Sequence, residues 1–235
     1  MSTATNAALN NRLLRSLPRS DFEKLQPHME VVELQFGEVL HDPGSTLRHV
    51  YFPETAVISM IIGTLDGASV EVGMIGRQGM SGVRAFLGAD TAPHAAIVQI
   101  AGSTIRLSSK SFKEVCQSCE VLPALVMRQA HILITQISQA AACHSLHTVK
   151  GRLSRWLLEL RDRTDLQQFS FTHQSISSRL GVRREAVTMA ARSLQRTGLI
   201  RYSRGRIELT DAKGLRELAC ECYSVLAGLL ESAES

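Results

Sequence analysis

The sequence has no recognisable targeting signal and no stretch that could cross a membrane. Its first residues, MSTATNAALNNRLL, lack the basic-then-apolar order of a secretory peptide. Its longest apolar runs, such as residues 56–63 (AVISMIIG), are far shorter than the roughly 20 residues of a membrane-spanning helix. Common catalytic motifs are also missing: there is no G-x-S-x-G, no H-E-x-x-H and no P-loop. We therefore expect a cytoplasmic protein that has no membrane partner and is not an enzyme.

Cysteine is scarce and does not form the pattern of a disulfide framework. The chain has five cysteines, an odd number for 235 residues. The stretches 116–119 (CQSC) and 143–147 (CHSLH) have spacings that could bind zinc. They lie near opposite ends of one expected helix, however, roughly 36 Å apart at 1.5 Å per residue. The pair in 220–222 (CEC) falls in an amphipathic last helix. We therefore expect buried structural cysteines and assign no metal ligand.

Positive charge is concentrated in one segment. The formal net charge is only +4, but residues 171–216 carry ten Lys or Arg against three acids, a local +7 that leaves about −3 for the rest. A basic segment attached to a slightly acidic body favours binding to a polyanion, although many basic clusters are merely solvated faces. Charge alone leaves these two alternatives open.

The amino-acid composition changes twice along the first half of the chain. Residues 1–20 are small and polar and are expected to form a flexible start. A short helix follows over residues 21–28, with Asp21 as its N-cap. Residues 29–109 contain short runs rich in Val, Ile, Tyr and Phe between many glycines, which is typical of an antiparallel β roll or barrel. We assign residues 21–115 to this β-roll domain.

A long helix is expected over residues 116–147, where glycine is absent. Apolar and small residues recur there at alternating spacings of four and three, the pattern of a helix that packs along a partner helix. A helix packed on its own domain is the alternative, and we favour a parallel homodimer. The predicted dimer interface consists of Val126, Ala130, Leu133, Ile137, Ala140 and His144.

Residues 148–235 are predicted to form a DNA-binding domain. A helix over residues 149–163 leads into two helices joined at Gly181, the first of them capped by Thr172. The second carries its polar groups at its N-terminal end, the geometry that fits a major groove. A strand, a turn and a strand over residues 199–207 (LIRYSRGRI) would then form an arginine-rich wing.

The start of the second helix has side chains suited to base recognition. Arginine pairs with O6 and N7 of guanine, and glutamate accepts a hydrogen bond from N4 of cytosine. The adjacent Arg184 and Glu185 could therefore recognise a G and a neighbouring C. Pairing with other side chains is the alternative, but a surface pair contributes little to stability.

The order of these parts resembles the Crp/Fnr superfamily of bacterial transcription regulators. The resemblance covers about residues 20–210, and its most specific stretch, LGVRREAVTMAARSLQRTGLI, is similar to the family pattern G-x-S-R-E-x-V-x-R…L…G-L-I. Gly79, Gly82 and Gly88 similarly match glycines of the family's roll. The resemblance implies an α+β fold with an N-terminal antiparallel β roll, like a cyclic-nucleotide-binding domain, a long dimerisation helix and a C-terminal winged helix-turn-helix.

The resemblance also implies which residues touch DNA. Arg184 and Glu185 stand at the family's base-reading positions, and Thr172 and Gln174 at positions that usually touch phosphates. Met189 replaces an arginine, and a thioether can touch a thymine methyl but cannot pair with guanine, so we expect a shifted or relaxed preference there. The expected DNA-binding residues are Thr172, His173, Gln174, Arg183, Arg184, Glu185, Thr188, Met189, Arg192, Arg204 and Arg206.

The effector site departs from the family pattern. Family members that bind cyclic AMP hold its ribose with a glutamate and its phosphate with an Arg-Ser pair, where this chain has Val83 and His94-Ala95. Valine cannot accept the ribose hydrogen bond, and His94 is charged only when protonated. Arg84, one residue from the expected place, is the alternative phosphate ligand. The candidate pocket is Gly82, Val83, Arg84, His94 and Ala95. We expect no cyclic AMP binding by the usual chemistry and find no evident cofactor, while haem and other nucleotides stay open.

These features predict a homodimeric, sequence-specific DNA-binding transcription regulator whose effector is unknown. The expected partners are double-stranded DNA with a pseudo-palindromic operator, a second copy of the chain, and RNA polymerase. The alternative is a ligand-binding or protein-interaction module in which the basic segment is incidental. That alternative predicts that activity survives replacement of Arg184 and Glu185.

Overall fold

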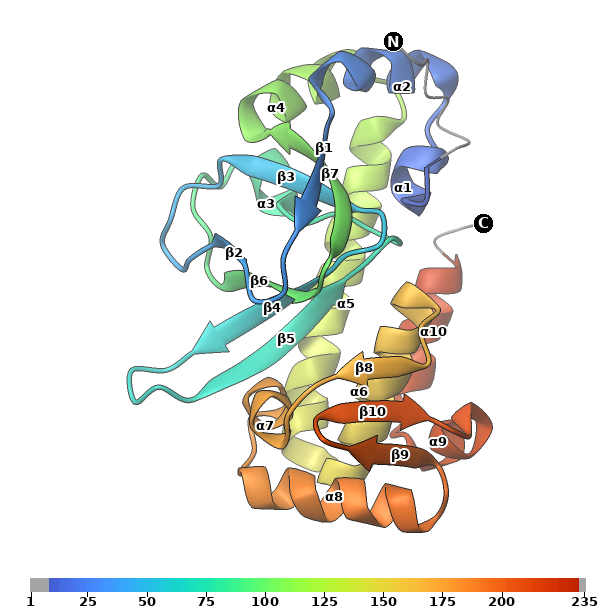
Figure 1. Ribbon diagram of the computed structural model, residues 1–235. Coiled ribbons are helices and arrows are strands. Elements are labelled where there is room, and N and C mark those ends of the chain that lie inside the picture. Colours follow the sequence, from blue (N-terminus) through green and yellow to red (C-terminus); the bar gives the residue numbers. More distant parts are fainter. Residues whose placement is uncertain (1–8, 233–235) are drawn as a thin grey trace. The chain divides into compact units, whose positions relative to one another are not determined.

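The computed structural model describes residues 9–232, which divide into two compact units (Figure 1). Among the described residues, the first unit contains residues 9–60, Met74–Ile134 and residues 230–232. The second contains Ile61–Gly73 and Thr135–Leu229. The long helix α5 (Leu122–Leu146) and the hairpin of β4 and β5 are therefore shared between the units.

The first unit contains two antiparallel sheets. One has the strand order β1-β7-β3, and the other has the order β2-β6-β4-β5, with a register shift where β2 pairs with β6. The strands are β1 (Glu30–Leu34), β2 (Val39–His41), β3 (His49–Pro53), β4 (Val57–Gly63), β5 (Ser69–Ile75), β6 (Ala95–Ile100) and β7 (Gly102–Ser108), and a short helix α3 (Val83–Phe86) follows β5. The predicted antiparallel roll over residues 29–109 is confirmed.

The start of the chain is more ordered than the sequence indicated. Residues 1–8 of the predicted flexible start lie outside the described residues, but α1 (Arg12–Arg15) forms a buried turn. Asn11 caps this helix by accepting a hydrogen bond from the backbone N–H of Leu14. Its amide nitrogen also donates to the carbonyls of Pro53 and Gly79, each at 2.9 Å. The buried amide therefore fastens this segment to the roll.

Asp21 does not cap the helix in which it lies, contrary to the prediction. That helix, α2, spans Arg19–Leu25, has Pro18 at its N-cap, and runs into a 3₁₀ turn over Gln26–His28. The Asp21 carboxylate is buried and accepts hydrogen bonds from the backbone N–H groups of residues 120–122, the shortest at 2.8 Å from Val121. It thus satisfies free N–H groups at the start of α5.

The predicted single helix over 116–147 is divided into α4 (Ser109–Ser118) and α5 (Leu122–Leu146). Val126 and Ala130 of the predicted dimer interface belong to the core of the first unit, and Ala140 is also buried. These three side chains are covered by the chain's own residues and are not part of an exposed surface, while the homodimer itself stays a prediction. No helix in the described part of the chain combines the length and apolar character that crossing a membrane requires.

A different face of α5 is exposed. Its residues recur at alternating spacings of three and four, the same heptad pattern rotated around the helix from the predicted one. This exposed stripe consists of Ala124, Met127, His131, Ile134, Ser138, Ala141 and Ser145. Ile137 of the predicted interface is exposed beside the stripe, whereas Leu133 and His144 are half-buried.

The second unit contains helices around a small three-stranded sheet with the order β8-β10-β9 (Figure 1). Its elements are α6 (Val149–Thr164), β8 (Gln168–Ser170), α7 (His173–Leu180), α8 (Arg184–Arg196), β9 (Ile200–Ser203), β10 (Arg206–Leu209), α9 (Ala212–Leu218) and most of α10 (Cys222–Ser232). The predicted helices and wing are confirmed, but β8 pairs with β10 where the sequence indicated a polar connection.

The centre of the second unit is helix α6, which is buried along almost its whole length. Trp156 on α6 donates a hydrogen bond through Nε1 to the carboxylate of Glu71 on β5, at 3.0 Å. The backbone carbonyl of Glu71 also lies 3.0 Å from Nε2 of His144 on α5. The far end of the β4–β5 hairpin is therefore attached to the same helices that carry the downstream elements.

Candidate nucleic-acid interface

Helices α7 and α8 are joined by a tight turn. Thr172 caps α7 because its Oγ1 accepts a hydrogen bond from the backbone N–H of Ser175, at 3.0 Å. Gly181 ends α7 with a φ of 59°, in the left-handed region that favours glycine. A Cβ at this position would also lie 3.0 Å from the Val70 side chain. The turn expected from the sequence is therefore formed, and both its conformation and its surroundings favour glycine.

Helix α8 has one buried and one exposed face. Its buried residues are those predicted, namely Val187, Ala190, Ala191 and Leu194. They allow α8 to pack on α6 and α7. The opposite face is free for a ligand and begins at the N-terminus of the helix, where unpaired backbone N–H groups give a partial positive charge that favours anions.

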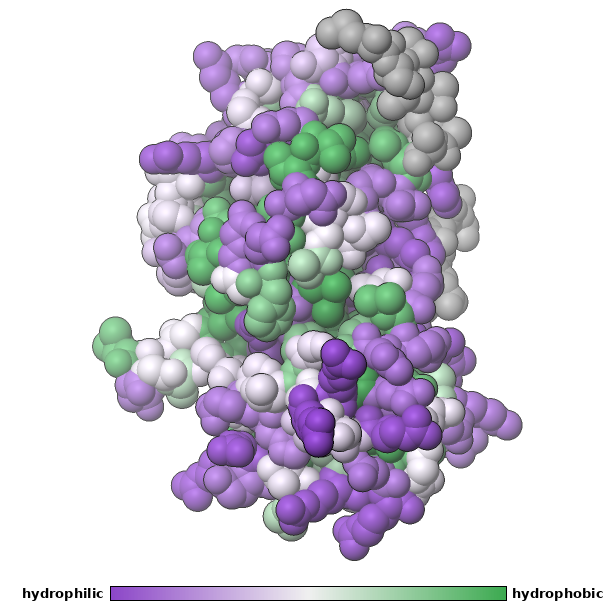
Figure 2. All heavy atoms as spheres, in the orientation of Figure 1, coloured by the Kyte–Doolittle hydropathy of each residue, from purple (hydrophilic) through white to green (hydrophobic). Residues whose placement is uncertain are grey.

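The exposed face of α8 is rich in arginine. Arg183, Arg184 and Glu185 are exposed at its N-terminal end, and Arg192 is exposed further along. Met189 lies between them with 72% of its surface exposed, unusual for a large apolar side chain. On the face shown in Figure 2, the surface over α8 and the wing is mainly hydrophilic. This face presents positive charge and one apolar contact, which suits a phosphate backbone with base edges between the strands.

The wing, which is the β9–β10 hairpin, presents two further arginines. Its two-residue turn consists of Arg204 and Gly205, with φ values of 48° and 77°, the positive angles of the turns favoured in hairpins. Arg204 and Arg206 are exposed. Arg201 instead forms a 2.7 Å ion pair with Glu208 across the hairpin. The positive charge available at the wing tip therefore comes from Arg204 and Arg206.

His173 has a different place from the one that the sequence indicated. Its Nδ1 lies 2.9 Å from Oγ1 of Thr188 on α8, and its ring stacks on Tyr202 of β9 with the centroids 4.3 Å apart. Its Nε2 is buried and has no hydrogen-bond partner among the described residues. Burial, and then the positive charges of Arg184 and Arg192, lower the pKa of His173, so its ring is neutral near pH 7. The ring therefore links α7, α8 and the wing instead of facing outward.

The candidate effector residues lie in the first unit, and four of the five line one small cavity. Gly82, Val83, Arg84 and His94 line it, and Ala95 does not. Its volume is about 40 Å³, whereas pockets for small molecules measure roughly 300 Å³ or more. Burial, with smaller contributions from His41 and Arg84, lowers the pKa of His94 to about 4, so this imidazole is uncharged at neutral pH.

The cysteines separate into two groups. Cys116 and Cys119 are part of the hydrophobic core of the first unit, as expected for structural cysteines. In the second unit, however, the structure brings the stretch 143–147 together with Cys220 and Cys222. The sequence spacings suggested 143–147 and 116–119 as the possible partners, and they gave no sign of this combination.

The comparisons with known proteins agree with this geometry. A family model described as a Crp-like helix-turn-helix domain matches residues 151–218, which contain α7, α8 and the wing. The transcriptional regulator SdrP of Thermus thermophilus is 36% identical over 77 residues, 30% of this chain and 38% of that protein. The chain thus spans less than two-fifths of this curated relative. These matches confirm the predicted helix-turn-helix.

Solved structures match over most of the chain at low sequence identity. A putative crp/fnr regulator from Eubacterium rectale has a TM-score of 0.69 and 15% identity, covering 88% of this chain and 96% of that chain. FixK2 from Bradyrhizobium japonicum has a TM-score of 0.67 and 14% identity, covering 82% of this chain and 98% of that chain. The c-di-GMP responsive regulator CLP from Xanthomonas campestris has a TM-score of 0.66 and 16% identity, covering 82% of this chain and 99% of that chain. At such identities the likeness concerns the fold alone, and it confirms the predicted fold class.

Proposed function

We propose that this protein is a homodimeric transcription regulator of the Crp/Fnr family that binds a pseudo-palindromic DNA site, as its Crp-like helix-turn-helix domain over residues 151–218 supports. The observation that carries this proposal is the exposed arginine face of α8 beside the two arginines at the wing tip. A DNA partner implies that the protein acts in the cytoplasm, with RNA polymerase as the protein that it recruits or blocks.

DNA recognition divides between α8 and the wing. The N-terminal end of α8 enters the major groove, where Arg184 pairs with a guanine and Glu185 accepts from a cytosine. Arg204 and Arg206 at the wing contact phosphates, which contribute affinity without sequence preference. His173 holds α8 against the wing through Thr188 and Tyr202, so that both contacts are made in one fixed geometry.

The exposed stripe of α5 supports a homodimer. It is the heptad pattern of a helix that packs along a second helix, with Met127 and Ile134 as its large apolar residues. In a homodimer bound to a pseudo-palindromic site, the two α8 helices would lie in successive major grooves about 34 Å apart.

The cavity in the roll supports a regulator that does not use cyclic AMP. It is too small for a nucleotide, and neither Val83 nor the neutral His94 can replace the ligands that cyclic AMP requires. The cavity is lined by Ile75 of β5 and Leu133 of α5. Both of these elements continue into the second unit. A signal that opened the cavity would therefore act directly on elements that also hold α6.

DNA selection from a random library, followed by fluorescence anisotropy at increasing salt, tests the proposal. We expect a palindromic site whose affinity falls about tenfold or more for each fourfold rise in salt, because several phosphates are neutralised. Replacing both Arg204 and Arg206 with alanine should reduce the slope of log K against log salt by about two. The matched control is Arg19→Ala, an exposed arginine of the first unit, which should leave the slope unchanged.

Salt-independent binding, or the absence of any selected site, would favour the alternative of a protein-interaction module. The same assay with cyclic AMP, cyclic GMP and cyclic di-GMP tests the effector site. Cyclic AMP should change neither the affinity nor the selected sequence, and a response to it would contradict our assignment of the cavity. Cyclic di-GMP is included because the Xanthomonas campestris regulator is described as responsive to it.

A further inference from the structure

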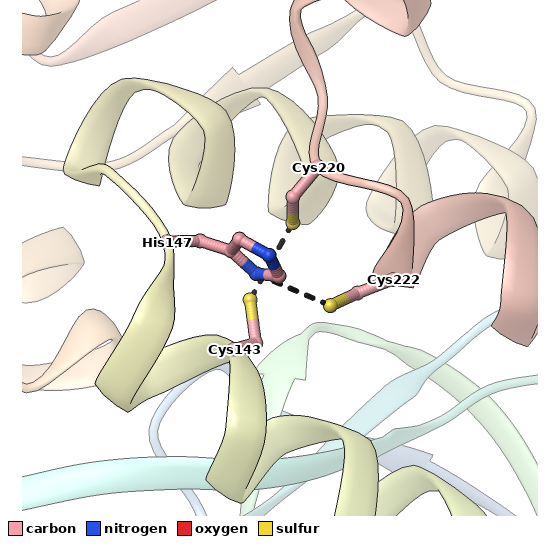
Figure 3. Close-up of side chains that lie close together, drawn as sticks. All are labelled: Cys143, His147, Cys220 and Cys222. Carbon is pink, nitrogen blue, oxygen red and sulfur yellow. Dashed lines mark hydrogen bonds between the residues drawn. The ribbon is translucent and has the colours of Figure 1, made fainter.

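Three cysteines and a histidine meet in the second unit (Figure 3). Cys143 lies in the last turn of α5, and His147 directly follows the helix. The backbone N–H of His147 still donates to the carbonyl of Cys143, at 3.2 Å, so the two side chains lie on one side. Cys220 lies in the loop after α9, and Cys222 is the first residue of α10. Figure 3 shows the four side chains directed toward one another. Two segments more than seventy residues apart in sequence are thus joined at one point.

The distances within this cluster suit one small cation. The four ligand atoms all lie within 4.8 Å of one another. Sγ of Cys143 is 3.5 Å from Sγ of Cys220, and Nδ1 of His147 is 3.4 Å from Sγ of Cys222. In a tetrahedral zinc site, the ion lies about 2.3 Å from each sulfur and about 2.0–2.1 Å from each nitrogen. The ligand atoms of such a site are then roughly 3.3–3.8 Å from one another. The side chains need to move by only a small amount to surround an ion.

The surroundings of the cluster are those of a metal site. Nε2 of His147 lies 3.0 Å from the carboxylate of Glu221, so the other ring nitrogen, Nδ1, faces the sulfur atoms. A histidine that is oriented by a carboxylate in this way is a common feature of zinc ligands. Gln139 donates a hydrogen bond to Sγ of Cys222, at 3.0 Å. Both contacts stabilise the orientation of a ligand.

The other two cysteines provide an internal comparison. Cys116 and Cys119 are surrounded by apolar side chains, the usual place of an unreactive thiol. Burial raises the pKa of Cys116 to about 12, so this thiol stays protonated. A polar imidazole nitrogen next to three sulfur atoms is a different environment, and simple core packing does not require it.

We propose that Cys143, His147, Cys220 and Cys222 bind one zinc ion in a tetrahedral site. Sulfur and imidazole ligands favour zinc over magnesium or calcium, which prefer oxygen. The four protein ligands fill all four positions of the ion, so the site is structural and leaves no place for a catalytic water. Binding releases the three thiol protons. The ion fastens the α9–α10 loop to the end of α5, next to the start of α6.

Metal content and cobalt spectra of the full chain test the proposal. The protein is purified without a histidine tag or chelator, equilibrated with zinc under reducing conditions and desalted. We expect close to one zinc per chain. Cobalt in its place should give the intense visible bands of tetrahedral cobalt and the ultraviolet bands of thiolate-to-cobalt charge transfer, and zinc should remove both. Loss of zinc should lower the Tm by at least about 5 °C, because the ion binds only the folded unit.

Two variants identify the ligands. Cys222→Ser removes a ligand and should abolish the cobalt bands. Glu221→Gln changes an exposed side chain and leaves all four ligands in place, but it removes the carboxylate that orients His147. It should weaken zinc affinity about ten- to a hundredfold, as measured by competition with a chromophoric chelator. The matched control is Glu217→Gln, the same change at an exposed position of α9 outside the cluster, which should leave the affinity unchanged.

Three results would overturn the proposal. The first is folded, reduced wild-type protein that retains no zinc and gives no cobalt bands. The second is unchanged zinc affinity in both Cys222→Ser and Glu221→Gln, which would place the metal elsewhere. The third is a disulfide between Cys143 and Cys220 in the purified protein, together with no metal binding after that disulfide is reduced. This result would identify the two cysteines as a redox pair instead of zinc ligands.

Discussion

Arg184 and Met189 lie on the same exposed face of α8 but have different chemistry. Arginine can form two hydrogen bonds with guanine, whereas methionine offers only an apolar contact. Within one operator half-site, the base pair opposite Arg184 should therefore be strongly specified and the one opposite Met189 weakly specified.

Arg184→Ala tests this difference at the level of one residue. The substitution should cost about 1–3 kcal/mol of binding free energy at one base pair and remove the preference there, while the remaining positions keep theirs. Competition binding with operators changed at single base pairs measures it. Met189→Arg serves as the complementary variant and should create a guanine preference. An equal loss for all operators would mean that Arg184 contacts phosphate only.

At the scale of elements, Asp21 connects helix α2 to the start of α5. Burial by itself would raise the pKa of this carboxyl, but the hydrogen bonds from three backbone N–H groups outweigh that effect and lower its pKa. Since the pKa is lower in the folded state, the ionised carboxylate stabilises the fold above its unfolded pKa of about 3.9. That stabilisation is lost as the pH falls through the lower folded value.

Asp21→Asn should therefore destabilise the protein by about 1–3 kcal/mol at neutral pH, because a neutral amide is a weaker acceptor for three N–H groups. Urea unfolding between pH 3 and 7 should show a constant difference from the wild type down to about pH 4 and a smaller one below. Glu23→Gln on the same helix is the control, since that side chain is exposed and pairs with Arg19. A difference that grows toward low pH would contradict the assignment.

At the scale of the whole molecule, the exposed stripe of α5 is the surface through which the proposed homodimer would form. Ile134 is 63% exposed, and a helix of 25 residues with such a stripe is typical of an intermolecular helix pair. Ile134→Asp would place two like charges in the seam, and we expect the dimer Kd to rise at least tenfold, about 1.4 kcal/mol. Analytical ultracentrifugation measures this change.

Val31→Asp gives the matched control for the dimer. Val31 is an exposed apolar residue of β1, so the same chemical change occurs away from α5. It should leave the dimer Kd unchanged. Wild-type protein that stays monomeric at all concentrations, or an Ile134→Asp variant that dimerises normally, would contradict an interface along this stripe.

Features that depend on neighbouring residues could be predicted from the sequence. The cap at Thr172, the left-handed turn at Gly181 and the buried face of α8 each follow from side chains within one or two helical turns. The arginines of the wing could be placed for the same reason, since a two-residue turn fixes which residues pair across a hairpin. These local signals determined the candidate DNA-binding surface.

Other features were decided by contacts between distant parts of the chain. A heptad pattern predicts an apolar helix face but does not indicate what packs against that face. Only the tertiary structure shows that Val126 and Ala130 pack in the chain's own core. The carboxylate of Asp21 accepts hydrogen bonds from backbone N–H groups about a hundred residues away in the sequence. The sequence alone indicated a helix near each half of the cysteine cluster, although it placed Cys220 in the last helix and the structure has it in the loop before α10. Only the tertiary structure brought those halves together, because the α9–α10 loop folds back onto the end of α5.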